Sequence, residues 1–267
     1  MAQAMQECSP EPRQHSRVPP DAPPVRAGGQ AHAPAGSPVA HRLAAVRRRI
    51  AEAARRAGRS GDEIVLVAVT KGVEPERIRE AWSAGQRIFG ENRVQELAAK
   101  AAALADLPLE WHMVGHLQRN KARDVARIAS VLHSLDSLRL AVELDRRLEA
   151  AGRHLRVLVE VNVSGEPGKF GVAPSDALEL VRAVAERCPH LKVEGLMAIG
   201  PNVPDELAIR GAFRRLRELL EEIRQKTPVG PAFRHLSMGM SSDFEWAIEE
   251  GATMVRIGTA IFGPRAR

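Results

Sequence analysis

Short apolar runs alternate with longer amphipathic segments along the chain from residue 41 onward. The runs have the length of β-strands, and residues 64–69 are six apolar residues in succession. Eight runs of this kind follow one another, at residues 64–69, 87–89, 111–114, 131–135, 157–163, 193–199, 235–238 and 254–257. The pattern therefore predicts eight strands.

Between the apolar runs, apolar residues recur at helical spacing. Helices are expected at residues 43–57, 74–84, 92–105, 118–128, 137–151, 174–187, 205–226 and 242–250. Several of these segments are followed by a residue that ends helices, such as Gly152 or Pro189. Eight strands that alternate with helices over roughly 225 residues favour a (β/α)8 TIM barrel over a doubly wound sheet. The segment at residues 43–57 is then an additional N-terminal helix.

The first 40 residues differ from the rest of the chain in composition. Prolines and glycines are frequent there and bulky apolar side chains are few, so this segment cannot offset the entropy of ordering by burial. We predict that residues 1–40 are a disordered extension, without the apolar core of a secretory signal, and that residues 41–267 form one barrel domain. No apolar run approaches the ~20 residues that span a bilayer, which excludes a transmembrane role.

Charge and cysteine content narrow the class of protein further. The net charge of +6 is the balance of 39 basic residues, six lysines and 33 arginines, against 33 acidic residues. The arginines are spread over predicted helix faces without interleaved aromatic residues. This distribution favours solvated helix surfaces over a dedicated nucleic-acid-binding surface. The two cysteines, Cys8 and Cys188, are too far apart in sequence to suggest a disulfide framework or a metal site, and they fit a cytoplasmic protein.

The residue after the first strand has the properties of a nucleophile. Functional side chains of a (β/α)8 barrel follow the carboxyl ends of its strands. Lys71 follows the run at residues 64–69, so we expect its amine to point into the mouth of the barrel from a desolvated position. Burial lowers the pKa of an amine and makes it reactive toward carbonyls. From position alone, a lysine that snorkels to the rim or forms an ion pair fits equally well.

Two loops near the end of the chain have donors that suit a phosphate group. Ser241 follows the seventh strand at the start of a predicted helix, and Gly258 and Thr259 follow the eighth strand. Loops after strands 7 and 8 commonly hold phosphate in this fold. Taken alone, Ser241 and its neighbour Ser242 are explained by helix capping. Together with Lys71, on a strand adjacent to the eighth in a closed barrel, the phosphate interpretation is the better one.

Six stretches of the sequence resemble a known family. They are VAVTK at residues 67–71, FGENRVQE at 89–96, WHMVGHLQRNK at 111–121, GLMAI at 195–199, LSMGMS at 236–241 and VRIGTAIFG at 255–263. In this order they resemble the pyridoxal phosphate homeostasis proteins, whose fold is the barrel of alanine racemase, known as fold type III of pyridoxal phosphate proteins. The resemblance implies that Lys71 holds pyridoxal 5'-phosphate as a Schiff base. It also implies that Ser241, Gly258 and Thr259 bind the phosphate.

The same resemblance assigns three further positions. Arg256 faces the nitrogen of the pyridine ring, and Asn92 and Met197 line the cofactor. Because a guanidinium does not give up its proton, Arg256 keeps the ring nitrogen neutral and makes the cofactor a weaker electron sink. Arg93 stands where the family often has a tyrosine, which removes any contact made there by a phenol.

The function that this resemblance implies is to carry and buffer pyridoxal phosphate, with apo forms of pyridoxal-phosphate enzymes as partners. We expect a monomer with no dedicated reaction, no metal, and neither nucleic acid nor a membrane as partner. An amino-acid racemase is the first alternative. Alanine racemases resemble this chain but take a catalytic tyrosine from an additional β domain, whereas this sequence contains no tyrosine. A nucleic-acid-binding protein is the second alternative, and it predicts steep salt dependence of binding.

Overall fold

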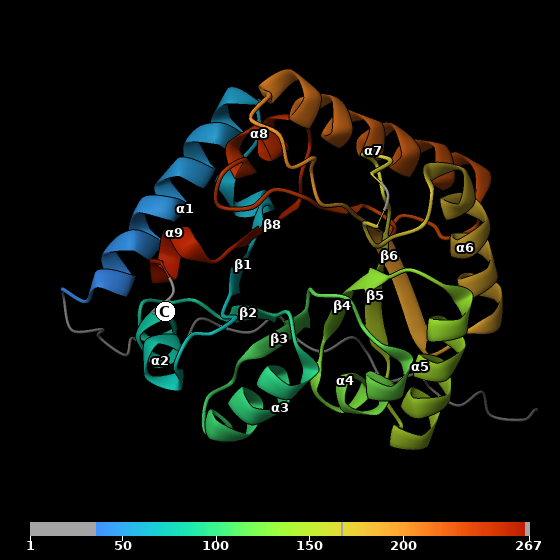
Figure 1. The fold of residues 1–267 in the computed structure, drawn as a ribbon, viewed down its shortest axis with the longest axis horizontal. Coiled ribbons are helices and arrows are strands. Elements are labelled where there is room, and N and C mark those ends of the chain that lie inside the picture. The colour runs from blue at the N-terminus through green and yellow to red at the C-terminus, as the bar shows by residue number, and fades with distance from the viewer. Residues whose placement is uncertain (1–35, 167, 265–267) are drawn as a thin grey trace, which may run out of the picture. The chain divides into compact units, whose positions relative to one another are not determined.

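Residues 36–166 and 168–264 are described by the computed structural model. Within them, eight parallel strands form a closed barrel in which each strand pairs with the next and β8 pairs with β1 (Figure 1). The strands are β1 (Val65–Val69), β2 (Ile88–Glu91), β3 (Glu110–Met113), β4 (Val131–Leu135), β5 (Leu155–Glu160), β6 (Leu191–Met197), β7 (His235–Ser237) and β8 (Met254–Ile257). The predicted (β/α)8 barrel is therefore confirmed.

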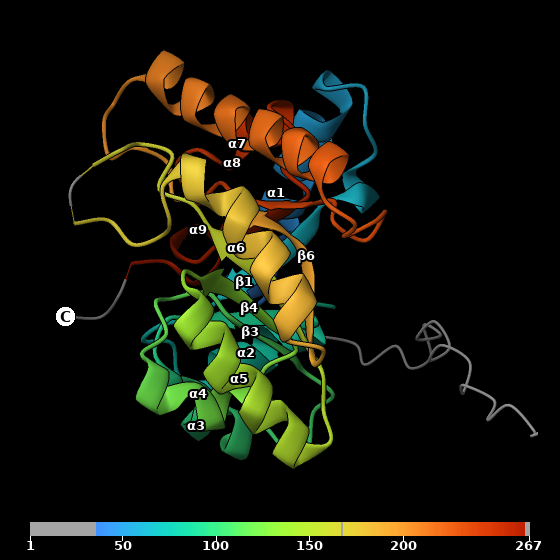
Figure 2. The same cartoon turned by 90° about the vertical axis from the view of Figure 1, so that its right-hand side faces the viewer.

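Helices surround the barrel in the alternating order that the sequence pattern predicts (Figures 1 and 2). The α-helices are α1 (Pro38–Arg56), α2 (Pro75–Ser83), α3 (Val94–Ala103), α4 (Ala122–Ile128), α5 (Leu138–Ala151), α6 (Pro174–Arg187), α7 (Glu206–Lys226), α8 (Phe244–Glu249) and α9 (Thr259–Phe262). Two short 3-10 helices, η1 (Gly61–Glu63) and η2 (Arg119–Lys121), precede β1 and α4. Helix α9 was not predicted, because four residues are too few to show helical periodicity.

Residues of β1 alternate between two faces of the barrel wall. Ala68 belongs to the large apolar cluster formed with the surrounding helices, whereas Val67 and Val69 belong to a separate cluster in the barrel interior. This period of two is the geometry of a strand, and it directs the side chain two residues beyond Val69 to the interior side as well. The strand thus aims residue 71 at the mouth of the barrel.

The additional N-terminal helix begins earlier than expected. Helix α1 starts at Pro38, and the Ser37 hydroxyl caps it by accepting a hydrogen bond from the amide of Ala40. Residues 38–40 are therefore helical, and Val39 is buried, although the sequence placed them in the disordered extension. The rest of the predicted extension, up to residue 35, lies outside the described residues. Proline at the first helical position and a serine cap are ordinary start signals that the proline-rich composition obscured.

Several predicted boundaries shift by two or three residues. Strand β2 extends through Gly90 and Glu91, and strands β5 and β6 begin two residues before their predicted starts and end at Glu160 and Met197. Helix α8 begins at Phe244 and not at Ser242. Boundaries shift in this way because sequence periodicity does not locate the last hydrogen bond of an element.

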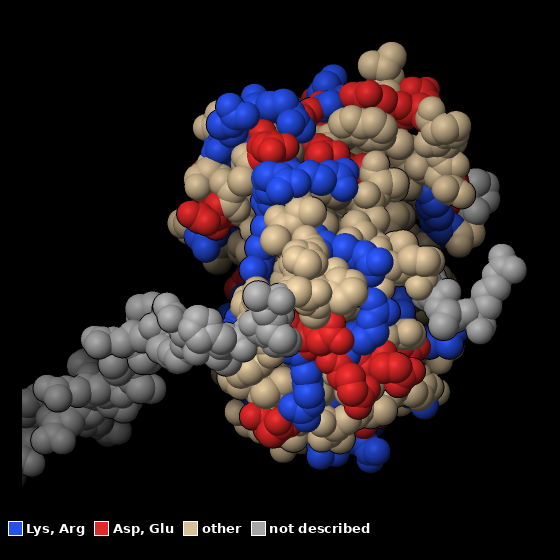
Figure 3. Space-filling model, turned by 90° about the vertical axis from the view of Figure 1, so that its left-hand side faces the viewer, with Lys and Arg blue, Asp and Glu red and all other residues tan. Residues whose placement is uncertain are grey.

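Arginines on the surface are widely paired with acidic side chains. Arg49 forms an ion pair with Glu245 at 2.8 Å, and Arg56 forms one with Glu249 at 2.6 Å, so that α1 is linked to α8. On the face shown in Figure 3, basic and acidic side chains are interspersed. This arrangement supports the interpretation of the arginines as a solvated surface. Among the described residues, no helix has the length and apolar content needed to cross a membrane.

Candidate functional site

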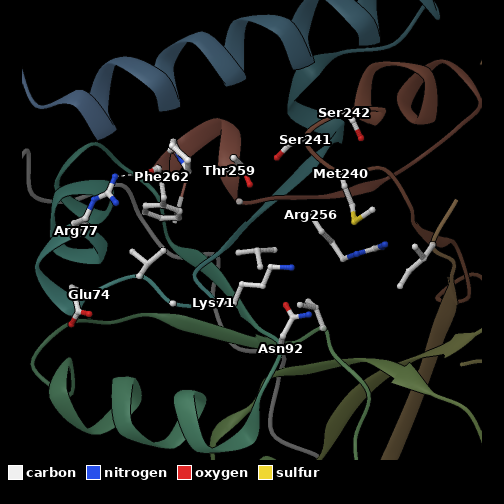
Figure 4. A pocket seen from close by; sticks show the side chains of 18 residues that line it. Lys71, Glu74, Arg77, Asn92, Met240, Ser241, Ser242, Arg256, Thr259 and Phe262 are labelled. Carbon is white, nitrogen blue, oxygen red and sulfur yellow. Dashed lines mark hydrogen bonds between the residues drawn. The ribbon is translucent and has the colours of Figure 1, made fainter. Parts of the chain in front are cut away.

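A cavity of about 440 Å³ lies at the carboxyl ends of β1, β2, β7 and β8 (Figure 4). It brings together six of the seven residues that the sequence assigned to a cofactor site. They are Lys71, Asn92, Ser241, Arg256, Gly258 and Thr259. These residues come from four separate loops or strand ends, so the barrel assembles one site from segments that are far apart in sequence.

Lys71 extends into this cavity from the turn after β1 (Figure 4). Its direction follows the alternation of Val67 and Val69, as expected. The expectation that Lys71 is desolvated is wrong, because the side chain is exposed. The turn that follows β1 carries Lys71 one residue beyond the apolar wall of the barrel. Its amine is therefore open to a molecule that enters the cavity.

The backbone on both sides of Lys71 is held by a buried cluster of charges. The Lys100 ammonium donates to the carbonyl oxygen of Thr70 at 2.6 Å and to the carboxylates of Glu91 at 2.6 Å and Glu96 at 3.1 Å. The Thr70 hydroxyl also donates to Glu91, and the amide of Gly72 donates to Glu96. Burial raises the pKa of Glu91, which the hydrogen bonds from Lys100 and Thr70 oppose. We call these five residues the Lys100 cluster.

The Lys100 cluster was not anticipated from the sequence. Lys100 lies on the amphipathic helix α3, where a lysine is ordinarily solvated, yet it is buried. Its partners come from the ends of β1 and β2, so the contact depends on the closure of the barrel. The cluster holds the backbone of Thr70 and Gly72 in place. The position of the Lys71 Cα atom between them is therefore fixed.

The two loops expected to bind phosphate meet in the cavity. The Ser241 hydroxyl accepts a hydrogen bond of 3.3 Å from the amide of Ala260 at the start of α9, which ties the loop after β7 to the segment after β8. Neither Ser241 nor Ser242 caps α8, whose N-cap residue is Asp243. Ser241 therefore does not cap the helix that follows it, and its hydroxyl serves the start of α9. Its hydroxyl lies instead on the wall of the cavity, beside Thr259.

Gly258 packs closely against the first strand. A side-chain carbon at this position would lie 3.1 Å from the carbonyl oxygen of Val69, which is tighter than ordinary contact. The absence of a side chain lets the backbone after β8 approach β1, and it keeps this part of the cavity wall as bare backbone. Donors of this kind suit an anion with several oxygens.

Arg256 contributes a buried guanidinium to the cavity. Its Nη1 donates to the Ser237 hydroxyl at 2.7 Å, and its Nη2 donates to the carbonyl oxygen of Ala198 at 2.9 Å. Burial lowers the pKa of Arg256 to about 10, and the nearby carboxylates of Glu160 and Asp243 oppose this shift. The side chain therefore stays protonated at neutral pH. It offers the cavity a fixed positive charge with donors only.

Met197 is the one predicted site residue that the structure does not bring to the cavity. It is buried in the barrel interior and packs with Val131, Leu158 and Met254. Strand β6 ends at Met197, so this side chain lies below the mouth, whereas Ile199, two residues further along the chain, lines the cavity. The predicted strand ran to residue 199 and placed its end two residues too late.

Several further lining residues were not identified from the sequence. Glu74 and Arg77 approach from the start of α2, Met240 from the loop after β7, and Phe262 from α9 (Figure 4). The Arg77 guanidinium donates to the carbonyl oxygen of Phe262. Met240 and Ile199 are partly exposed apolar side chains and can cover the flat face of a ring. Met240, Ile199 and Phe262 lie in stretches that carry the family resemblance, but only the barrel geometry shows that their side chains line the cavity.

His112 and His116, four residues apart in the sequence, do not share a site. His112 is buried in the barrel, where it contacts His133 and Glu110. His116 lies near Asp136, with 3.2 Å between its Nδ1 and the carboxylate.

Comparison with known proteins identifies the family to which this chain belongs. The alanine racemase N-terminal domain family matches residues 42–266. The pyridoxal phosphate homeostasis protein of Aquifex aeolicus is 47% identical over 224 residues, which covers 84% of this chain and 97% of that protein. The protein of the same name from Escherichia coli K12 is 44% identical over 230 residues, with 85% and 97% covered. The chain belongs to the family of pyridoxal phosphate homeostasis proteins.

Solved structures agree with this family membership. The structure of PipY from Synechococcus elongatus with pyridoxal phosphate bound is similar with a TM-score of 0.74 at 38% identity, and it covers 84% of this chain and 100% of that chain. Alanine racemase from Corynebacterium glutamicum is similar with a TM-score of 0.64 at 18% identity, covering 85% of this chain and 61% of that chain. The second likeness concerns the fold alone. The family resemblance that the six sequence stretches indicate is thus confirmed.

Proposed function

We propose that this protein binds pyridoxal 5'-phosphate in the cavity and carries and buffers it. One observation supports this function above the others: Lys71 is the only primary amine among the described residues that line the cavity, and it shares the cavity with the Ser241 and Thr259 hydroxyls. The names of the curated relatives and the pyridoxal-phosphate-bound PipY structure point the same way. When bound, the cofactor supplies an aldehyde that reacts with primary amines.

The cavity fits this cofactor at each of its ends. We assign the aldehyde end to Lys71 and the phosphate end to Ser241, Gly258 and Thr259. A side chain at Gly258 would press on the Val69 carbonyl oxygen and displace this loop from β1, so glycine keeps the loop in place at the phosphate end. Asn92 lines the cavity as well, and we assign it to the ring. Met197 has no place in this assignment, because it packs in the barrel interior.

The charge at Arg256 argues against a dedicated reaction. With a pKa of about 10, this guanidinium holds its proton at pH 7 and offers no acceptor to the ring nitrogen of the cofactor. A neutral ring nitrogen stabilises a carbanion poorly. The other ionisable side chains among the described lining residues are Lys71, Glu74 and Arg77, so no histidine, cysteine or tyrosine is present there for proton transfer.

We therefore favour storage and delivery over racemisation. A racemase requires a proton-transfer group on each side of the substrate, and each such group typically contributes about 10² to 10⁴ in rate. We propose that apo forms of pyridoxal-phosphate enzymes in the cytoplasm receive the cofactor, and that the carrier acts as a monomer. Sedimentation of the loaded protein tests the last point.

The test of this function compares delivery with turnover. Loaded wild-type protein is mixed with an apo pyridoxal-phosphate enzyme, and recovery of that enzyme's activity is followed beside a matched amount of free cofactor. In parallel, each L-amino acid is incubated with the loaded protein and its optical purity is measured. We expect transfer without racemisation. Racemisation or transamination at about 1 per second or faster, which lies at the low end of ordinary enzyme rates, would contradict the carrier function.

A further inference from the structure

A column of hydrogen-bonded polar side chains crosses the barrel interior below the cavity. Arg256 on β8 donates to Ser237 on β7, whose hydroxyl lies 2.8 Å from Nδ1 of His133 on β4. The Nε2 atom of His133 lies 2.9 Å from Nδ1 of His112 on β3. The Nε2 atom of His112 lies 3.1 Å from the carboxylate of Glu110, at the amino-terminal end of β3. The column therefore joins the cavity to the opposite end of the barrel.

Both ends of this column have fixed hydrogen-bonding roles. Arg256 carries donors only, so the Ser237 oxygen accepts from it. At the other end, the Arg156 guanidinium forms an ion pair with Glu110, which keeps that carboxyl group ionised and able only to accept hydrogen bonds. Between a fixed donor and a fixed acceptor, each group of the column must accept a hydrogen bond from the Arg256 side and donate one toward Glu110.

One arrangement of hydrogens satisfies the whole column with neutral histidines. The Ser237 hydroxyl donates to Nδ1 of His133, the Nε2–H of His133 donates to Nδ1 of His112, and the Nε2–H of His112 donates to Glu110. The opposite tautomers would place a bare Nε2 of His112 against a carboxylate, where both atoms are acceptors. A reversed column therefore requires a charged His112 with hydrogens on both nitrogens.

Burial opposes that charged state. Desolvation lowers the pKa of His112, although Glu110 acts in the opposite direction, and it holds the pKa of His133 well below the usual value. The charged and titratable groups around His133 are Arg256, Arg156, His112 and His235; the two guanidinium groups disfavour a proton on it, as a charge on either histidine would. The neutral, one-way column is thus the stable arrangement.

We propose that Ser237, His133 and His112 are positioning residues that hold the Arg256 guanidinium beneath the cavity, with both histidines fixed as Nε2–H tautomers. Ser237 and the carbonyl oxygen of Ala198 each accept from one of the five N–H groups of Arg256, and these two bonds set the plane of the guanidinium. The consequence for the cofactor, that this plane faces the ring nitrogen, rests on the proposed function. The tautomers do not depend on it.

The tautomers are measured directly by NMR on the full-length protein labelled with ¹⁵N. Long-range ¹H–¹⁵N correlation spectra distinguish Nδ1–H, Nε2–H and charged imidazoles, and His112→Gln and His133→Gln variants assign the two signals. We expect both residues as neutral Nε2–H tautomers at neutral pH, and no charge change of either near pH 6.5. An Nδ1–H tautomer of either residue at neutral pH, or a charge change of either near pH 6.5, would overturn the proposal.

The effect on the cofactor is measured with a matched pair of serine variants. Ser237→Ala removes the acceptor of Arg256, whereas Ser134→Ala removes a buried serine hydroxyl that donates to the carbonyl oxygen of Gly115 at 2.6 Å. Ser134 is on β4, next to His133 in sequence, and it lies outside the column. It controls for the loss of a buried hydroxyl from the barrel wall.

We expect Ser237→Ala to weaken pyridoxal phosphate binding about tenfold, the effect of one lost hydrogen bond to a charged group, and to shift the pH profile of the bound cofactor's absorption. Ser134→Ala should keep the wild-type affinity and profile. Equal affinities and profiles in the two variants would contradict the positioning role. If wild-type protein bound no cofactor, the proposed function would fail, while the NMR result would still decide the tautomers.

Discussion

Replacing Lys100 by methionine tests whether the charge cluster behind Lys71 is as tightly coupled as its geometry indicates. Methionine keeps most of the side-chain volume but removes the ammonium that contacts Thr70, Glu91 and Glu96. The Glu91 carboxylate is fully buried, so the substitution leaves it without its counter-charge. Removing one partner of a buried ion pair typically costs about 3–5 kcal/mol.

This cost is large enough to measure by thermal denaturation. For a domain of this size, each kcal/mol lowers Tm by about 2–4 °C, which gives a decrease of about 6–20 °C for Lys100→Met. Lys226→Met is the matched control, because Lys226 pairs with Glu222 at 2.6 Å on the exposed surface of α7, where such a pair contributes about 0.3–0.5 kcal/mol. Equal changes of Tm in the two variants would show that Lys100 stabilises the fold no more than a surface lysine does.

A second substitution separates lost charge from lost packing. Adding Glu91→Gln to Lys100→Met removes the unpaired carboxylate, so we expect at least half of the lost stability to return. Lowering the pH should act similarly. Burial already raises the pKa of Glu91, and without Lys100 the folded state takes up its proton more readily, so the difference from wild type should be smaller at pH 5 than at pH 8. A double variant as unstable as Lys100→Met alone would show that packing is the cause.

Two further predictions concern pH and the N-terminal segment. Burial raises the pKa of Glu160 to about 7, so between about pH 4.3 and pH 7 the folded chain holds a proton that the unfolded chain has released. The free energy of unfolding should therefore fall as the pH rises through this range. Glu160→Gln should reduce this pH dependence in urea denaturation curves measured at several pH values. Deletion of residues 2–35 keeps the Ser37 cap of α1. It should change Tm by less than about 2 °C and leave cofactor occupancy unchanged, because the composition of the deleted segment cannot build a core. A larger loss of either would show that this segment packs on the barrel.

The barrel could be predicted from the sequence because strands and helices each leave a pattern in neighbouring residues. Apolar runs and helical periodicity alternate regularly, and the residue after each run identifies the mouth of the barrel, which is how Lys71, Ser241 and Gly258 could be placed in one site. The depth of a side chain within the barrel is not local. Met197 and Ile199 lie two positions apart and point to the same side of the chain. Which of them reaches the cavity depends on where β6 ends.

Polar side chains inside the barrel were the hardest to recognise. His133 and Ser237 occupy short apolar runs, where single polar residues have no pattern of their own. Their partners lie on other strands, so their roles depend on which strands face each other across the barrel. Lys100 was missed for the same reason, because a lysine on an amphipathic helix is ordinarily expected in solvent.

The most direct test of the account is to locate the bond between the cofactor and the chain. Full-length protein is loaded with pyridoxal phosphate, its visible absorption is recorded, and borohydride reduction followed by peptide mapping identifies the labelled lysine. We expect a visible band that reduction removes, with the label on Lys71, and neither band nor label in Lys71→Ala. A label on Lys121 or Lys169, or a wild-type protein that acquires no label, would contradict it.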